Sequence, residues 1–337
     1  MKIVRTDSEL QTPRLDDALQ KMGHQLVLLA DGVSEEKLIN EIVDADLLLM
    51  CYTPITRSVI EAATSLKGIV KYGVGIDAID IDAAKQHGVV VVNVPEYAEE
   101  TVAEGAFALM IALAKKLILI DRHMHTDGWA WPEQQWMGSD IAGKTVGLIG
   151  FGKIGKSMAR MAGSGFRARV IAYDPHLSAE EMAACNVEQY DDLQALMRDS
   201  DFVSVHCVLN PQTLHLVGER ELRAMKNTAF LVNVSRGAIV DEAALTRVLN
   251  EGEIAGAGLD VFGLEPLDNT EHPMASLYTH PSVILSPHLT FYTDEAMQRL
   301  EAETLQRCTE ILRGQMVTIK SDDKRLTGQD KLAVYQC

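Results

Sequence analysis

Three side chains suited to acid–base chemistry lie in the second half of the chain: Arg236, Glu265 and His288. Each follows a predicted parallel strand, and ligands of open α/β sheets bind beyond the carboxyl ends of the strands, so we expect the three to converge. Arginine offers a planar fork for a carboxylate, and histidine titrates near neutrality. A carboxylate beside a histidine holds the ring and favours its protonated form. Together these residue types suit the interconversion of a carbonyl and an alcohol.

Each of the three also has an ordinary interpretation when it is taken alone. Arg236 would serve in a surface salt bridge, Glu265 as a solvated loop charge, and His288 as a packed residue. Their joint position after strands favours a catalytic set. No Gly-x-Ser-x-Gly sequence occurs, so a serine hydrolase has no support.

A glycine-rich turn lies upstream of this set. Residues 150–155 satisfy G-x-G-x-x-G between an apolar strand pattern and a helical pattern. Gly150 would permit the tight turn, Gly152 the approach of the backbone to phosphates, and Gly155 close packing of helix on strand. The free N–H groups and the helix dipole there favour a pyrophosphate. The alternative is a structural glycine turn.

Asp174 ends the next predicted strand, 19 residues after Gly155. A carboxylate at this place accepts both ribose hydroxyls of an adenosine and repels a 2′-phosphate, which favours NAD over NADP. Taken alone, Asp174 is equally well a turn residue or a helix cap. Arg169 and His176 are the nearest candidates to bind a 2′-phosphate instead.

Positioning these residues requires alternating strands and helices, and the sequence has that alternation almost throughout. Short β-branched runs cover residues 2–6, 25–29, 46–50, 68–72 and 89–94, and a second series covers 145–149, 169–173, 202–207, 229–234, 256–261 and 283–286. This predicts an α/β protein with parallel sheets covered by helices.

One long helix is predicted over 98–125. Another, over 293–312, is expected to pack back on the first unit, which makes that unit discontinuous. The polar tail from Lys320 predicts a surface arm or a frayed end.

Composition excludes several classes of protein. Lys plus Arg number 31 against 48 Asp plus Glu, a net charge of −17, so we expect no nucleic-acid partner. No apolar run approaches the roughly 20 residues of a membrane span, and residues 1–7 lack an apolar core, so we expect neither a membrane span nor an export signal. The scattered cysteines favour a reducing cytoplasm over disulfides and make a metal site unexpected. They are Cys51, Cys185, Cys207, Cys308 and Cys337.

The sequence resembles the D-2-hydroxyacid dehydrogenase family, which includes phosphoglycerate, glyoxylate, D-lactate and formate dehydrogenases. The similarity covers about residues 45–300, and the ordered co-occurrence of its motifs is specific. The matching segments are 72–77, 101–104, 143–147 with the glycine turn, 233–238, 240–242, 258–266 and 287–288. The resemblance implies two doubly wound domains: a flavodoxin-like substrate domain, residues 1–99 and 290–337, with a Rossmann NAD-binding domain, residues 100–289, inserted in it.

The resemblance also implies roles for individual residues. Arg236 would bind the substrate carboxylate, Glu265 would orient the histidine, and His288 would be the acid/base. Formate dehydrogenases have a glutamine at the glutamate position, so Glu265 favours a 2-hydroxy acid. Substrate contacts would come from Tyr52, Val74, Gly75 and Arg236. NAD contacts would come from Thr101, Gly150, Gly152, Lys153, Ile154, Gly155, Asp174, Cys207, Val234, Ser235 and Asp260.

Four questions stay open at this point. Phosphoglycerate dehydrogenases have arginines after the third strand, whereas residues 50–56 contain no cation, which predicts an uncharged substrate side chain; Arg57 and Lys71 are the nearest cations. The alternatives to a 2-hydroxyacid dehydrogenase with such a substrate are a phosphoglycerate dehydrogenase, an NAD-sensing corepressor of the same fold and a hydrolase that retains NAD. We expect a homodimer or a dimer of dimers. Trp129, Trp131 and Trp136 would line a pocket, form a subunit contact or, as we favour, pack within the chain.

Overall fold

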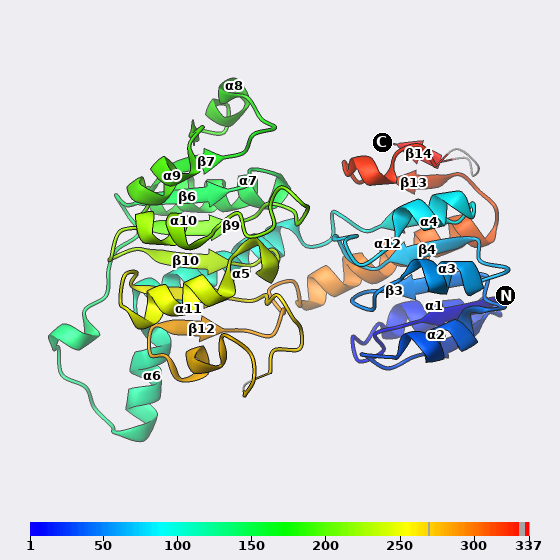
Figure 1. Ribbon diagram of the computed structural model, residues 1–337, viewed down its shortest axis with the longest axis horizontal. Helices are drawn as coiled ribbons and strands as arrows, with labels where there is room; N and C mark the ends of the chain where they lie inside the picture. The colour runs from blue at the N-terminus through cyan, green and yellow to red at the C-terminus, as the bar shows by residue number, and fades with distance from the viewer. Residues whose placement is uncertain (269, 330–333, 337) are drawn as a thin grey trace. The chain divides into compact units, whose positions relative to one another are not determined.

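The computed structural model describes residues 1–268, 270–329 and 334–336. The chain forms two compact units, Met1–Ala98 with Thr293–Cys337 and Glu99–Tyr292. Each unit is built on a parallel sheet with helices along both faces (Figure 1). The first unit is therefore discontinuous, and the second is inserted in it.

The sheet of the first unit has the strand order β2-β1-β3-β4-β5, and every pair of strands is parallel. This is the flavodoxin-like order, which confirms the predicted class. Strands β3 to β5 are buried along their whole length because helices cover both faces of a parallel sheet. The strands are β1 Lys2–Arg5, β2 Gln25–Leu28, β3 Leu47–Met50, β4 Gly68–Lys71 and β5 Val90–Asn93. The helices are α1 Pro13–Lys21, α2 Glu35–Ile42, α3 Arg57–Ala62, α4 Ile81–Gln86 and α12 Asp294–Leu312.

Helix α12 returns to the first unit, as predicted, and packs on α1 and β4. Contact with the strand is so close that a Cβ at Gly68 would lie 2.9 Å from a methyl carbon of Ile311. The buried carboxylate of Glu301 accepts a hydrogen bond from the amide of Leu15 at 2.9 Å. Apolar packing and a satisfied buried charge therefore fix the helix.

The tail after α12 is packed as far as Gln329. Leu326 is fully buried, and the side-chain amide of Gln329 accepts from the N–H of Val91 at 2.7 Å and donates to its carbonyl at 3.0 Å. Val91 lies on β5, an edge strand, so Gln329 satisfies backbone groups that the edge would otherwise expose. Strand β13 Val317–Ile319 pairs in parallel with β14 Val334–Gln336. The expectation of a frayed end is wrong for this part of the tail.

The sheet of the second unit has the order β12-β11-β10-β9-β6-β7-β8, again all parallel. The chain builds β6, β7 and β8 toward one edge of the sheet and β9 to β12 toward the other. The strand order therefore reverses between β6 and β9, as in the Rossmann fold. The two-residue strand β8 is not predicted because it has no apolar run. The strands are β6 Thr145–Ile149, β7 Arg169–Tyr173, β8 Glu188–Gln189, β9 Phe202–Val205, β10 Phe230–Asn233, β11 Gly256–Leu259 and β12 Val283–Leu285. The helices are α5 Glu99–Ala114, α6 Leu117–Thr126, α7 Lys153–Arg160, α8 Ala179–Ala183, α9 Leu193–Asp199, α10 Glu219–Ala224 and α11 Glu242–Asn250.

The single helix predicted over 98–125 is wrong: it is two helices, α5 and α6. Lys116 between them has φ 50°, a left-handed conformation that ends the first helix. Helix α5 packs on α7, β10 and β11, whereas α6 has no buried residue. The segment with α6 extends away from the rest of its unit (Figure 1).

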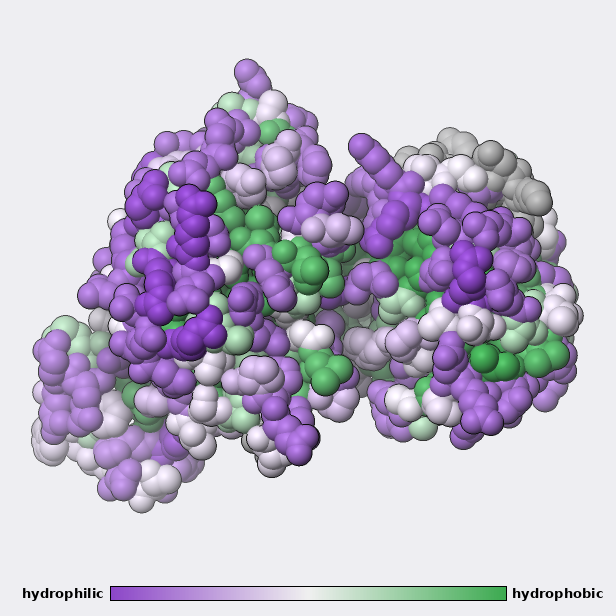
Figure 2. Space-filling model, viewed as in Figure 1, coloured by the Kyte–Doolittle hydropathy of each residue, from purple (hydrophilic) through white to green (hydrophobic). Residues whose placement is uncertain are grey.

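The tryptophans that follow α6 do not pack as predicted. Trp129 and Trp131 are 70% and 72% exposed, and they contact each other edge to face. Only Trp136 packs locally, against His123. Elsewhere hydrophilic residues cover most of the visible surface (Figure 2). Among the described residues, no helix has the length and apolar character needed to cross a bilayer.

Candidate active site

The glycine turn joins β6 to α7, and its three glycines have different surroundings. Gly150 has φ 92°, and a Cβ there would lie 2.5 Å from the amide nitrogen of Cys207. A Cβ on Gly155 would lie 2.7 Å from the carbonyl oxygen of Gly150. Gly152, which precedes the first residue of α7, has open space around its Cβ position. The helix N-terminus therefore faces space in which an anion can approach the backbone.

Asp174 is hydrogen-bonded to this turn. Its carboxylate accepts hydrogen bonds from the amide of Phe151 at 2.9 Å and from the amide of His176 at 3.0 Å. Arg169, a candidate for binding a 2′-phosphate, instead pairs with Glu188 at 2.6 Å. The local charge thus favours a ribose diol over a phosphate.

Three further residues are predicted to contact a cofactor: Lys153 and Ile154 within the turn, and Thr101 on α5. Lys153 pairs with Glu99 at 3.2 Å, and Ile154 packs on the core beneath the sheet. Thr101 is buried on α5. The side chain of Ile154 is thus partly committed to packing.

The ends of β9 and β10 are tied together beside the glycine turn. The hydroxyl of Ser235 donates to the carbonyl of Cys207 at 2.5 Å, and Val234 is buried. Burial raises the pKa of Cys207 to about 12, so its thiol stays protonated and is a poor nucleophile. Burial lowers the pKa of His206 to about 4, so this histidine stays neutral near pH 7. Neither residue is therefore a candidate acid/base near pH 7.

Arg236 follows β10 on a turn that the side chain of Asn233 shapes. The Asn233 amide donates to the carbonyl of Arg236 at 3.0 Å and accepts from the N–H of Ser235 at 3.1 Å. The next residue must be glycine, because a Cβ at Gly237 would lie 1.9 Å from the carbonyl carbon of Phe262. The turn with Arg236 therefore packs directly on the segment that leads to Glu265.

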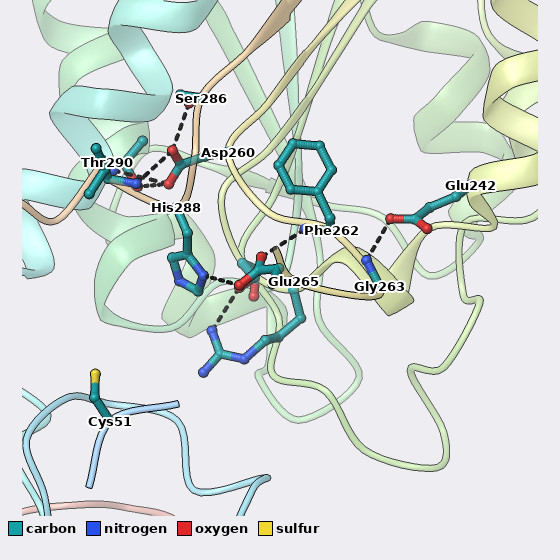
Figure 3. Close-up of polar contacts among 12 residues, drawn as sticks. Cys51, Glu242, Asp260, Phe262, Gly263, Glu265, Ser286, His288 and Thr290 are labelled. Carbon is teal, nitrogen blue, oxygen red and sulfur yellow. Dashed lines mark hydrogen bonds and ion pairs between the residues drawn. The ribbon is translucent and has the colours of Figure 1, made fainter. Parts of the chain in front are cut away.

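The structure brings Glu265 and His288 together (Figure 3). Oε2 of Glu265 lies 2.8 Å from Nδ1 of His288, and Oε1 accepts from the amide of Phe262 at 2.9 Å. Burial by itself would raise the pKa of Glu265. The hydrogen bond and charge of His288, the Phe262 amide and the charge of Arg236 together hold that pKa below its ordinary value. Glu265 is thus a carboxylate that supports a positive charge on the imidazole.

His288 itself has φ 56°, which is uncommon for a residue with a side chain. Its N–H donates to the carbonyl of Asp260 at 2.7 Å. The Asp260 carboxylate, which is fully buried, accepts from the Ser286 hydroxyl at 2.6 Å, the Leu289 amide at 2.9 Å, and the amide and hydroxyl of Thr290 at 3.0 and 2.7 Å. Asp260, predicted to contact a cofactor, is therefore engaged on both oxygens by the loop that carries His288 (Figure 3).

In the first unit, Tyr52 lies on a turn organised by a residue that the sequence analysis missed. The buried carboxylate of Asp7 accepts from the amides of Cys51, Tyr52 and Thr53 at 2.7, 3.0 and 3.1 Å. Burial would raise the pKa of Asp7, but these bonds and those from the hydroxyls of Thr6 and Thr53 lower it. Asp7 lies just after β1, and this position after a strand is the signal by which the sequence could have indicated Asp7 as a site residue.

Val74 and Gly75 follow β4 in the same unit. The side chain of Asn93, at the end of β5, donates to the carbonyl of Val74 at 2.6 Å and fixes this peptide. Within the described part of the chain, no acceptor takes the N–H of Val74 or Gly75. These amides are therefore available to an oxygen of a ligand.

The two cations nearest to residues 50–56, Arg57 and Lys71, have different surroundings. Arg57 is at the surface, where it pairs with Glu61 and Asp80. Lys71 is 6% exposed; its ammonium donates to the carbonyl of Cys51 and lies 5.4 Å from the centre of the Tyr52 ring. Residues 50–56 contain no cation themselves, but a buried cation from β4 thus lies next to them.

Comparison with known proteins identifies the family. Residues 107–290 match the D-isomer specific 2-hydroxyacid dehydrogenase, NAD binding domain. The chain belongs to this family. It is 39% identical to the glyoxylate reductase of Korarchaeum cryptofilum (strain OPF8) over 84% of both chains. It is 36% identical to the D-3-phosphoglycerate dehydrogenase of Methanocaldococcus jannaschii over 94% of this chain and 58% of that protein. The structure of D-lactate dehydrogenase from Aquifex aeolicus, in complex with NAD and lactic acid, superposes with a TM-score of 0.83 at 27% identity, covering 93% and 96% of the two chains.

The D-2-hydroxyacid dehydrogenases are NAD-dependent oxidoreductases, and the second unit of this dehydrogenase fits that cofactor. The open Cβ position of Gly152 leaves room for a pyrophosphate at the start of α7. Asp174, which the Phe151 amide holds beside the turn, suits a ribose diol.

Proposed function

We propose that this dehydrogenase reduces a 2-oxo acid to a 2-hydroxy acid and catalyses the reverse reaction, with His288 as the acid/base. The observation that carries the proposal is the 2.8 Å contact between His288 and Glu265, with Arg236 near enough to lower the pKa of that carboxyl. All three lie in the unit that binds NAD.

When bound, the cofactor supplies or accepts the hydride at C2 of the substrate. Because Nδ1 of His288 contacts Glu265, Nε2 is the nitrogen that gives its proton to the carbonyl oxygen during reduction and takes the hydroxyl proton during oxidation. Glu265 stabilises the imidazolium before the proton leaves and fixes the ring orientation. Arg236 holds the substrate carboxylate with its planar fork and polarises the carbonyl.

The substrate that we propose is a small 2-oxo acid with an uncharged side chain, glyoxylate first among them. Relatives named glyoxylate reductase support this choice. In the first unit, the unused amides of Val74 and Gly75 suit the substrate carboxylate, and Tyr52 supplies an aromatic wall. The ammonium of Lys71 is buried and already bonded to Cys51, which makes it a weak anchor for a second negative charge.

A phosphorylated substrate is the second candidate, and Lys71 is the observation that favours it. Among the described residues, no carboxylate oxygen lies within 4 Å of its ammonium, so its charge is not neutralised locally. An anionic group near Tyr52 would gain from that charge. The phosphoglycerate dehydrogenase relative is consistent with this candidate.

The experiment is NADH oxidation measured against glyoxylate, pyruvate, branched and aromatic 2-oxo acids, 2-oxoglutarate and 3-phosphohydroxypyruvate at matched ionic strength. We expect the largest kcat/KM among the small neutral compounds. A clear preference for the phosphorylated compound that Lys71→Met abolishes would establish the second candidate. No turnover of any 2-oxo acid would overturn the proposed function.

We also propose that the enzyme is a homodimer joined through the α6 segment. An isolated helix of ten residues is marginal in water, yet α6 has no buried residue. The segment also exposes a concentration of large apolar side chains. These are Leu117, Ile118, Met124, Trp129, Trp131 and Met137. Replacing Trp129 and Trp131 with serine should convert the dimer to a monomer in light scattering; an unchanged mass would contradict this interface.

A reducing compartment, the cytoplasm, is the proposed site of action. Cys51, Cys185, Cys207 and Cys308 are all free thiols, and two of them are buried. Cys337 lies outside the described residues. Thiols kept reduced are typical of cytoplasmic proteins.

A further inference from the structure

A second carboxylate, that of Glu242, lies close to the segment that carries Glu265. Glu242 is the first residue of α11. Its Oε1 accepts from the amide of Gly263 at 2.6 Å, and its Oε2 lies 3.4 Å from Nε2 of His272. The side chains of Glu242 and His272 are only 15% and 7% exposed. One nearly buried carboxylate thus contacts two residues, Gly263 and His272, that are nine positions apart in the chain.

The contact with His272 has a defined direction. Nδ1 of His272 accepts a hydrogen bond from the amide of Met274 at 3.2 Å. A ring nitrogen that accepts has no hydrogen of its own, so the hydrogen is on Nε2, which lies 3.4 Å from Oε2 of Glu242. The Gly263 amide therefore fixes one oxygen of the carboxylate by a hydrogen bond, while His272 contacts the other oxygen.

Two neighbouring amides connect this carboxylate to the acid/base pair. The Gly263 amide donates to Glu242, and the preceding amide, that of Phe262, donates to Glu265. Glu265 in turn contacts His288 (Figure 3). Glu242 holds the peptide between Phe262 and Gly263, and the Phe262 N–H that holds Glu265 belongs to the adjoining peptide, so the two hydrogen bonds act on either side of the same Cα.

The peptide has little freedom on its other side. A Cβ at Gly237 would lie within 1.9 Å of Phe262 and 2.2 Å of the Gly263 nitrogen, so the turn after Arg236 touches this backbone. A shift of the peptide would therefore disturb Arg236 and Glu265 together.

We propose that Glu242 is a positioning residue for the dehydrogenase reaction: with His272, it fixes the peptide Phe262–Gly263 and thereby holds Glu265 against Nδ1 of His288. The inference rests on the proposed function of His288 and Glu265. A carboxylate at the start of a helix also favours the helix dipole. That role would affect stability alone, whereas positioning affects the acid/base pair.

The test compares Glu242→Ala and Glu242→Gln with Glu265→Gln. For each variant the measurements are NADH affinity, kcat, KM and the pH midpoint of kcat/KM for reduction of the best 2-oxo acid. Glutamine keeps an oxygen for the Gly263 amide, whereas alanine removes the acceptor. Asp268→Ala is the control, because Asp268 caps the same segment through the Thr270 and Glu271 amides, and within the described residues no hydrogen bond joins it to the Phe262–Gly263 peptide.

We expect Glu242→Ala to lower kcat at least about tenfold, since small misplacements of catalytic groups have large effects on rate. Its pH midpoint should move to lower pH, in the direction of Glu265→Gln, because a histidine without its carboxylate loses its proton more easily. NADH affinity should stay within about twofold, and Glu242→Gln should recover most of kcat. The double variant with Glu265→Gln should shift the midpoint no further than Glu265→Gln alone.

The inference fails if Glu242→Ala lowers only the melting temperature, or lowers the rate equally at every pH as a general structural lesion would. It also fails if Asp268→Ala reproduces the shift. If Glu265→Gln itself leaves the pH midpoint unchanged, the proposed function of the pair is wrong instead, so the two failures are distinguishable.

Discussion

Replacing Asp260 with asparagine should damage both the stability of the NAD-binding unit and catalysis. Asp260 accepts four hydrogen bonds, two on each oxygen. An asparagine amide replaces one oxygen with an NH2 group. The hydroxyl of Ser286 or Thr290 can rotate to accept from it, but the N–H of Leu289 or Thr290 cannot. One buried backbone N–H therefore loses its acceptor in either orientation of the amide.

An unsatisfied buried donor costs about 1–3 kcal/mol. The remaining hydrogen bonds become weaker because their acceptor is no longer a charged carboxylate. We therefore expect a loss of about 2–4 kcal/mol in the free energy of unfolding of this unit. Because the same loop carries His288, kcat should fall about 10- to 100-fold. Thr290→Val is the matched control: it removes one hydroxyl bond and should cost only about 1 kcal/mol. Urea denaturation and stopped-flow NADH oxidation measure the two effects. A variant within 0.5 kcal/mol of wild type (roughly the effect of a neutral surface change) with normal kcat would refute the reasoning.

Three other substitutions test separate parts of the account. Arg236→Lys should lower kcat/KM about 100-fold and leave NADH affinity nearly unchanged, because a point charge replaces a bidentate fork; weaker NADH binding with normal substrate kinetics would assign the arginine to the cofactor. Wild type should prefer NADH to NADPH, and Asp174→Ala should narrow that preference in kcat/KM; an NADPH-preferring wild type would contradict the role of Asp174. Asp7 has a folded-state pKa below its ordinary value, so its stabilisation is present above the unfolded pKa near 3.8 and is lost as pH falls through the folded pKa. Asp7→Asn should therefore destabilise the first unit at neutral pH and flatten its stability below about pH 4, as measured by denaturation against pH; an unchanged pH profile would exclude Asp7 as the cause.

Most of the fold could be predicted because apolar β-branched runs identify buried parallel strands. The runs 145–149 and 169–173 correspond to β6 and β7 residue for residue. The break at Lys116 could not be predicted, since the apolar pattern continues on both sides of it and the left-handed conformation of one residue decides the outcome.

The supporting carboxylates of the site were the least predictable feature. Asp7 bonds to residues near position 52, and Asp260 bonds to Thr290, 30 residues away. Such contacts depend on which strand ends meet, and a lone aspartate carries no local signal of its partners. The approach of Arg236, Glu265 and His288 to one another could be predicted because each follows a strand, whereas their catalytic roles stay a prediction.

The central claim is that His288, held by Glu265, transfers the proton during reduction of a 2-oxo acid. Single-turnover oxidation of bound NADH by glyoxylate, followed at 340 nm in wild type and His288→Gln, tests it most directly. The account predicts that the variant binds NADH with unchanged affinity and transfers hydride about 10²- to 10⁴-fold more slowly. Hydride transfer at the wild-type rate in His288→Gln would contradict it.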